Sequence, residues 1–187
     1  FDLSYSTGAV YGTAWEGLGS TVAATSFDYD EAGDISLVTL NGSATKSGDR
    51  IRLTQAAANQ AGSAWLTSPI NFGQDYSFRT AFDLEISAPG GSSDADGLGA
   101  DGMTFVIQSN GPTRLGAAGA GLGLDGGTGP TTFIAVEFDT WQTGSFDPDG
   151  LLPTHVGFDR NGVGSFARVA VPRFNDGGRK HAAVEYD

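Results

Sequence analysis

Two carboxylates separated by a single residue, Glu137 and Asp139, end a run of apolar residues. In an extended strand, residues two apart point to the same side and lie about 7 Å apart. Asp147 and Asp149 follow in a turn-rich stretch, and His155 lies in the next apolar run. We expect these groups to converge. Carboxylates with carbonyl oxygens suit a hard cation such as Ca²⁺, and carboxylates with one imidazole suit Mn²⁺ or a similar transition metal.

The spacing is also compatible with two exposed acids on a solvated face, and spacing alone leaves this alternative open. Like charges at this density repel one another unless a cation lies among them. Two further segments, residues 94–97 and 147–150, read Asp-x-Asp-Gly in the manner of a calcium loop. Neither has the spacing or the closing glutamate of an EF-hand.

Strands must position these groups, and alternating apolar and polar residues predict them. The longest predicted strand covers residues 76–86. One face carries Tyr76, Phe78, Thr80, Phe82, Leu84 and Ile86, and the other carries Ser77, Arg79, Ala81, Asp83 and Glu85. Shorter strands are predicted over residues 35–40, 50–54, 103–108, 133–139, 154–158, 165–171 and 182–186.

The composition favours an all-β protein. The chain has 187 residues, with 29 Gly and 12 Phe, and turn residues and aromatics are plentiful while good helix formers are scarce. The only helix-like stretch, residues 55–61, is too short to be stable alone. We therefore expect an antiparallel sandwich or barrel. Two glycine-rich stretches, residues 90–101 and 116–129, flank one predicted strand and are expected to meet at one end of the sheet.

The charge and the absence of cysteine exclude several classes of function. The chain has 10 basic and 22 acidic residues, a net charge of −12, so we expect no nucleic-acid binding. With no cysteine it cannot form disulfides, thiol active sites, zinc fingers of the cysteine type or iron–sulfur centres. No apolar run approaches membrane-spanning length, so we expect no membrane insertion.

The segment that reads AVEFDTW, then DP, then HVG, over residues 135–157, resembles the metal-binding signature of the legume-type (L-type) lectins. Other segments resemble further parts of this family in the same order. Residues 52–54, 62–65, 69–70 and 77–80 resemble its early strands, residues 100–105 its "ADG" carbohydrate-site strand, and residues 119–124 its glycine loop. The resemblance covers most of the chain, and we expect a bacterial member of the family.

This resemblance implies a concanavalin-A-like jelly-roll sandwich. Residues 1–187 are expected to form one carbohydrate-binding domain, truncated at its C-terminus, because the family continues into further strands after the segment that matches residues 184–187. A homodimer or a second chain is then expected to complete the sandwich.

The resemblance also implies adjacent Mn²⁺ and Ca²⁺ sites. Carried over by motif, Glu137 binds the transition metal and His155 completes that site. Asp139 and Asp147 bridge both ions, and the main-chain carbonyl of Trp141 binds calcium.

The implied carbohydrate site lies beside the metals. Asp101 would accept hydrogen bonds from sugar hydroxyls, helped by a main-chain N–H among Gly119, Ala120 and Gly121. The ring of Trp141 would form a stacking wall, with an ordinary core or rim aromatic as the open alternative. A cis peptide bond between Ala100 and Asp101 is also implied.

The chain departs from the family at Thr143, where the family has an asparagine that touches both calcium and sugar. Thr143 is therefore the candidate at this position in both sites. Ser145 or Asp149 is the candidate to supply the missing oxygen.

The expected function is a non-catalytic, metal-dependent carbohydrate-binding module, exported or on the cell surface and part of a larger adhesin, with glycans or glycoconjugates as partners. One alternative is a glycosidase of the laminarinase-like type, which carries E-x-D-x-x-E on one strand. Glu137 and Asp139 match its first two positions, but Gln142 stands where the third acid belongs. The other alternative is a structural adhesin module that calcium merely stabilises.

Overall fold

The computed structural model describes residues 3–4, 14–17, 37–48, 50–70, 76–89, 93–143, 153–162 and 165–186. Every regular element within these ranges is a β-strand, which confirms the predicted all-β class. The helix-like stretch over residues 55–61 forms bends and turns. These ranges also contain no helix of the length and apolar character needed to cross a membrane.

The described residues form fourteen strands. They are β1 (Leu3–Ser4), β2 (Ala14–Gly17), β3 (Val38–Gly42), β4 (Thr45–Ser47), β5 (Arg50–Arg52), β6 (Gly62–Leu66), β7 (Tyr76–Leu84), β8 (Ser93–Asp94), β9 (Gly97–Leu98), β10 (Gly102–Gln108), β11 (Phe133–Asp139), β12 (His155–Arg160), β13 (Ala167–Ala170) and β14 (Lys180–Tyr186).

Most predicted strands are present with shifted ends. The prediction for β11 is confirmed at both ends. β7 ends at Leu84 rather than residue 86, because its pairing with β14 begins at Leu84 opposite Lys180. β5 is two residues shorter than predicted, and β12 extends two residues further. The strand predicted over residues 35–40 corresponds to β3, although residues 35–36 lie outside the described ranges.

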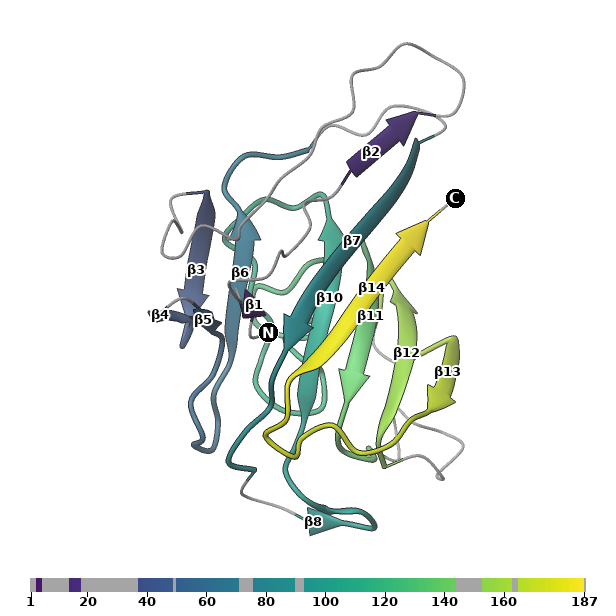
Figure 1. The fold of residues 1–187 in the computed structure, drawn as a ribbon. Helices are drawn as coiled ribbons and strands as arrows, with labels where there is room; N and C mark the ends of the chain where they lie inside the picture. The colour runs from purple at the N-terminus through teal and green to yellow at the C-terminus, as the bar shows by residue number, and fades with distance from the viewer. Residues whose placement is uncertain are drawn as a thin grey trace.

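Two antiparallel sheets form the two layers of a sandwich. One sheet has the order β14-β7-β1-β5-β4, with β2 also paired to β7, and the other has the order β10-β11-β12-β13. In Figure 1, β7 and β14 run across the strands β10 and β11. A hairpin of β8 and β9 and a two-stranded sheet of β3 and β6 complete the described strands.

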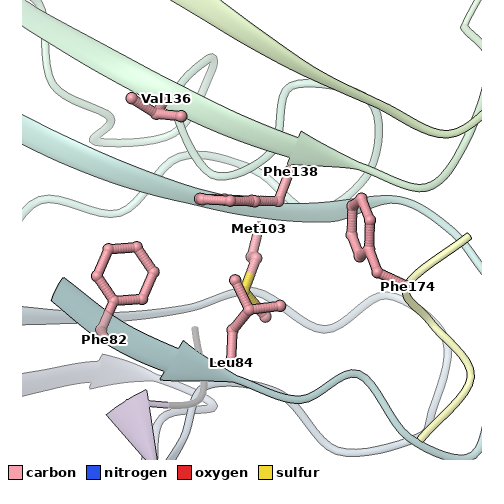
Figure 2. Packing of buried hydrophobic residues seen from close by; sticks show 6 residues of the cluster. All are labelled: Phe82, Leu84, Met103, Val136, Phe138 and Phe174. Atoms are coloured by element: carbon pink, nitrogen blue, oxygen red, sulfur yellow. The ribbon is translucent and has the colours of Figure 1, made fainter. Parts of the chain in front are cut away.

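Apolar side chains from both layers form the main core (Figure 2). Phe82 and Leu84 of β7 face Met103 of β10 and Phe138 of β11, and Phe174 closes the cluster. The Phe82 and Phe138 rings pack edge to face with centroids 5.9 Å apart. Burying side chains of this size contributes about 1.5–3 kcal/mol each, so this core is the main link between the two sheets.

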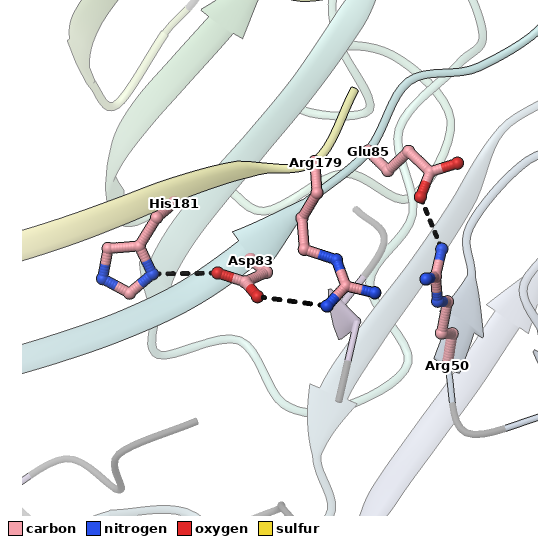
Figure 3. Close-up of polar contacts among 5 residues, drawn as sticks. All are labelled: Arg50, Asp83, Glu85, Arg179 and His181. Atoms are coloured by element: carbon pink, nitrogen blue, oxygen red, sulfur yellow. Dashed lines mark hydrogen bonds and ion pairs between the residues drawn. The ribbon is translucent and has the colours of Figure 1, made fainter. Parts of the chain in front are cut away.

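The opposite face of β7 is polar, as its alternation predicts. Asp83 lies 2.9 Å from Nδ1 of His181 and 3.8 Å from Nη1 of Arg179, and Glu85 forms a 2.5 Å ion pair with Arg50 (Figure 3). These pairs lie on the side away from the core and join β14 and β5 to β7 and the residue that follows it.

Candidate functional site

The pairing of β11 with β12 assembles the acidic group. Asp139 lies opposite His155, and Glu137 lies opposite Gly157. Directly opposite residues of an antiparallel pair share a face, so both acids and the imidazole point to the same side. One ligand atom from each of Glu137, Asp139 and His155 lies within 4.8 Å of the others. The sequence expectation that these three converge is met.

These groups are buried rather than solvated. Glu137 and Asp139 are each 5% exposed and His155 is 0% exposed, which contradicts the alternative of two exposed acids on a solvated face. Nε2 of His155 lies 3.3 Å from Oε1 of Glu137, and Oδ1 of Asp139 accepts a 2.6 Å hydrogen bond from the Trp141 N–H. Two buried carboxylates beside one imidazole are costly unless a cation neutralises them. This donor set therefore fits a divalent transition metal.

Space beside Glu137 is kept open by Gly157. An ideal Cβ at Gly157 would lie 2.3 Å from Oε1 of Glu137 and 2.0 Å from Oγ of Ser165. Within the described part of the chain, this buried Ser165 hydroxyl has no hydrogen-bond partner. Neither Ser165 nor Gly157 is among the predicted site residues. The sequence signal for Gly157 is a glycine inside an apolar strand, which marks a close approach of neighbouring atoms to the backbone.

Asp101 lies beside the end of β11. β10 begins at Gly102, which pairs with Asp139, and the Asp101 carbonyl accepts a 2.9 Å hydrogen bond from the Thr140 N–H. The peptide bond between Ala100 and Asp101 is cis, as the resemblance implies. Burial raises the pKa of the Asp101 carboxyl above its ordinary value.

The glycine loop, residues 119–124, folds back toward the start of β10. The Thr104 hydroxyl donates a 3.4 Å hydrogen bond to the carbonyl of Leu122. Asp101, Gly119, Leu122 and Trp141 line one cavity of about 1290 Å³ that extends between β7 and β10. Leu122 of the second glycine-rich stretch thus lies beside Gly102, the residue that follows the first stretch. Ala120 and Gly121 belong to the loop but not to this lining.

The remaining predicted site residues are only partly placed. Trp141 and Thr143 are half-buried in the segment that follows β11. Ser145, Asp147 and Asp149 lie outside the described residues, so their expected roles stay predictions.

Comparisons with known proteins give one consistent answer. A family model for the legume lectin domain matches residues 24–187. The lectin alpha chain of Lablab purpureus is 27% identical over 173 residues, which cover 87% of this chain and 59% of that protein. The structure of basic winged bean lectin with Tn-antigen has a TM-score of 0.67 at 28% identity and covers 82% of this chain and 65% of its own. The lectin from Bauhinia forficata in complex with GalNAc has a TM-score of 0.67 at 25% identity. The match covers 83% of this chain and 69% of the Bauhinia lectin.

These likenesses confirm the expected jelly-roll sandwich. The chain spans about half the length of the curated relatives that it matches.

Proposed function

Because the chain belongs to the legume lectin domain family, we propose that it is a metal-dependent carbohydrate-binding module without catalytic activity. The observation that carries this proposal is the buried group of Glu137, Asp139 and His155 directly beside Asp101. The winged bean lectin with Tn-antigen and the Bauhinia lectin in complex with GalNAc support a glycan as the ligand.

The proposed cofactors are Ca²⁺ and Mn²⁺ or a similar transition metal. Glu137 and His155 would hold the transition metal, and Asp139, with Asp147, would contact both ions. The Trp141 carbonyl and an oxygen of Thr143, Ser145 or Asp149 would bind calcium. Bound cations would neutralise the buried carboxylates and so fix the segment after β11 against Asp101.

Asp101 is the proposed sugar acceptor. A carboxylate can accept two hydroxyl donors, and such charge-assisted hydrogen bonds are stronger than neutral ones. The loop around Gly119, Ala120 and Gly121 would supply a main-chain N–H. Trp141 would stack on the sugar ring and Thr143 would contact the sugar.

The glycosidase alternative is disfavoured by the position of Glu137. A nucleophilic carboxylate must reach the substrate, but Glu137 is buried and faces His155. A retaining mechanism also needs a second carboxyl group about 5–5.5 Å away that is free to act as acid and base. The E-x-D-x-x-E pattern places this group at position 142, where the chain has Gln142.

The proposed setting is extracellular, within a larger secreted or surface adhesin. The net charge of −12 and the absence of cysteine suit a calcium-rich or saline medium. A homodimer or a second chain is the proposed protein partner.

A glycan array with and without calcium tests the function. We expect calcium-dependent binding that Asp101→Ala abolishes and that Asp176→Ala, at an exposed residue, preserves. Elemental analysis of the purified protein should find a divalent cation. Equal binding by Asp101→Ala would move the sugar site elsewhere, and metal binding without any glycan would favour the structural adhesin module.

A further inference from the structure

A small hairpin lies against the candidate site. In β8 and β9, Ser93 pairs with Leu98 and Asp94 pairs with Gly97. In Figure 1, β8 lies at the end of the four-stranded sheet where β10 begins. The same end holds the last residue of β11 and the first residue of β12, so the hairpin is close to both strands that carry Glu137, Asp139 and His155, here called the metal group.

Each of the two hairpin acids, Asp94 and Asp96, bonds a residue in a segment that flanks that group. Oδ2 of Asp94 accepts a 3.1 Å hydrogen bond from the N–H of Gln142, in the segment that follows β11. Oδ2 of Asp96 accepts a hydrogen bond from the hydroxyl of Thr154, the residue before His155. The hairpin therefore joins the end of β11 to the start of β12.

Two side chains from the segment before β14 hold the hairpin from the other side. Arg173 donates from Nη1 to the Asp96 carbonyl at 2.9 Å and from Nη2 to the Leu98 carbonyl at 2.6 Å. Asn175, which is 1% exposed, donates from Nδ2 to the carbonyls of Leu98 at 3.2 Å and Gly99 at 3.3 Å. Nε of Arg173 also donates to Oδ1 of Asn175 at 2.5 Å, which fixes the two side chains relative to each other.

The hydrogen bonds of Asn175 reach Gly99, close to Asp101, the proposed sugar acceptor. Gly99 precedes Asp101 by two residues and has a positive φ of 114°. An ideal Cβ at Gly99 would lie 2.7 Å from Nδ2 of Asn175 and 2.7 Å from Cβ of Pro89. Glycine is thus the residue that lets the buried amide reach the carbonyls leading into Asp101.

We propose that this hairpin positions the site: Asn175 and Arg173 fix the approach to Asp101, and Asp94 and Asp96 fix the segments beside the metal group. The proposal rests on the proposed function, because it assigns these four side chains to positioning for glycan and cation binding. None of them needs to touch the glycan.

Two alanine variants separate positioning from general stability. Asn175→Ala should weaken glycan binding about tenfold while Ca²⁺ and Mn²⁺ affinities stay within about twofold, because it removes the hydrogen bonds to the carbonyls that lead into Asp101 while Arg173 keeps its own hydrogen bonds to the hairpin carbonyls. Asp94→Ala should weaken both cation and glycan binding, because it releases Gln142. Asp176→Ala is the matched control, since Asp176 is exposed, lies on the same segment as Asn175 and bonds only Gly178 and Lys180 in the described contacts.

A conservative pair at Thr154 gives a second arm that does not depend on those variants folding. Thr154→Ser keeps the hydroxyl that donates to Asp96 and should bind like wild type. Thr154→Val keeps the shape, removes the hydroxyl and should weaken cation binding. Equal affinities in the serine and valine variants would overturn the role of Asp96.

Amide hydrogen exchange separates failure of this proposal from failure of the proposed function. The Thr140 N–H bonds the Asp101 carbonyl and is not touched by Asn175, so Asn175→Ala should speed its exchange without changing the β11–β12 ladder. If wild type binds no glycan, the proposed function fails, and this exchange rate still decides the positioning role. The positioning role would be overturned if the exchange rate of the Thr140 N–H were unchanged in Asn175→Ala. It would also be overturned if every variant lost glycan and cation affinity in parallel and had a lowered Tm.

Discussion

Gly157 leaves space beside the buried group of Glu137, Asp139 and His155. Its replacement by alanine would place Cβ 2.3 Å from Oε1 of Glu137, a distance that forces the carboxylate or the strand to move. We expect Gly157→Ala to lose about 1–3 kcal/mol of unfolding free energy, as overpacked sites do, and to bind cations more weakly. Urea unfolding and calorimetric titration with Mn²⁺ measure the two effects.

Gly162→Ala is the matched control for this variant. Gly162 lies just after the same strand, and the nearest atom to its ideal Cβ is the Arg160 carbonyl oxygen at 4.0 Å. It should unfold and bind cations like wild type. Equal behaviour of the two variants would show that the space beside Glu137 does not matter.

Asp101 gives the protein a pH dependence with a definite direction. Burial raises its pKa, so the carboxylate proposed to accept sugar hydroxyls is lost at a higher pH than an ordinary aspartate of pKa about 3.9. Glycan affinity should be full at neutral pH and fall as pH is lowered through this raised pKa. A series of glycan titrations between neutral and acidic pH measures the midpoint, and a midpoint at or below the ordinary value would contradict the prediction.

The raised pKa of Asp101 makes stability depend on pH in the opposite direction from glycan affinity. A raised pKa means that the folded chain binds this proton more tightly than the unfolded chain, so its stabilising contribution is present at low pH and is lost as pH rises through the folded pKa. Without added cations, Asp101→Asn should therefore not lower Tm at neutral pH. Melting curves at neutral and acidic pH check this, and a lowered neutral Tm would contradict it.

At the scale of the elements, one turn residue fixes the start of β11. Asn161 has a positive φ of 50°, and its Oδ1 accepts a 2.8 Å hydrogen bond from the Phe133 N–H. Asn161→Ala removes the acceptor and places alanine in an unfavourable conformation, so we expect a loss of about 1–2 kcal/mol in urea unfolding. Asn161→Asp keeps the acceptor oxygen and tolerates the positive φ, so it should lose little stability. If the alanine and aspartate variants lost equal stability, the effect would belong to the turn as a whole and not to this acceptor.

The strands that carry the candidate site were the easiest elements to predict. β7 and β11 are long enough for alternation to define their faces, and the spacing of Glu137 and Asp139 with a following His155 predicts one shared side. β4, β8 and β9 have only two or three residues each, too few for periodicity to detect. The contacts of Arg173 and Asn175 with the hairpin join residues more than seventy positions apart, and no local pattern encodes them.

For the whole molecule, cations should couple binding to stability. A ligand that binds only the folded state stabilises it by about 2.7 kcal/mol at a hundred times its Kd. For a chain of this size that corresponds to a rise in Tm of about 5–10 °C. Thermal melts with Ca²⁺ and Mn²⁺, and then with excess chelator, measure the difference.

Glu137→Gln supplies the control for these melts. It keeps the shape of the side chain and removes one buried charge, so its Tm should respond much less to Mn²⁺ than that of wild type. Identical melts of wild type with cations and with chelator would contradict metal dependence of the fold.

The placement of the metal group across β11 and β12 also bears on how the chain reaches its native pairing. Successive side chains of a strand point to opposite faces, so a slip of one residue between these strands would turn Glu137 and Asp139 away from His155. A cation held by all three groups would bind only in the native register. Such a cation would favour the correct alignment of the two strands during folding over the slipped one.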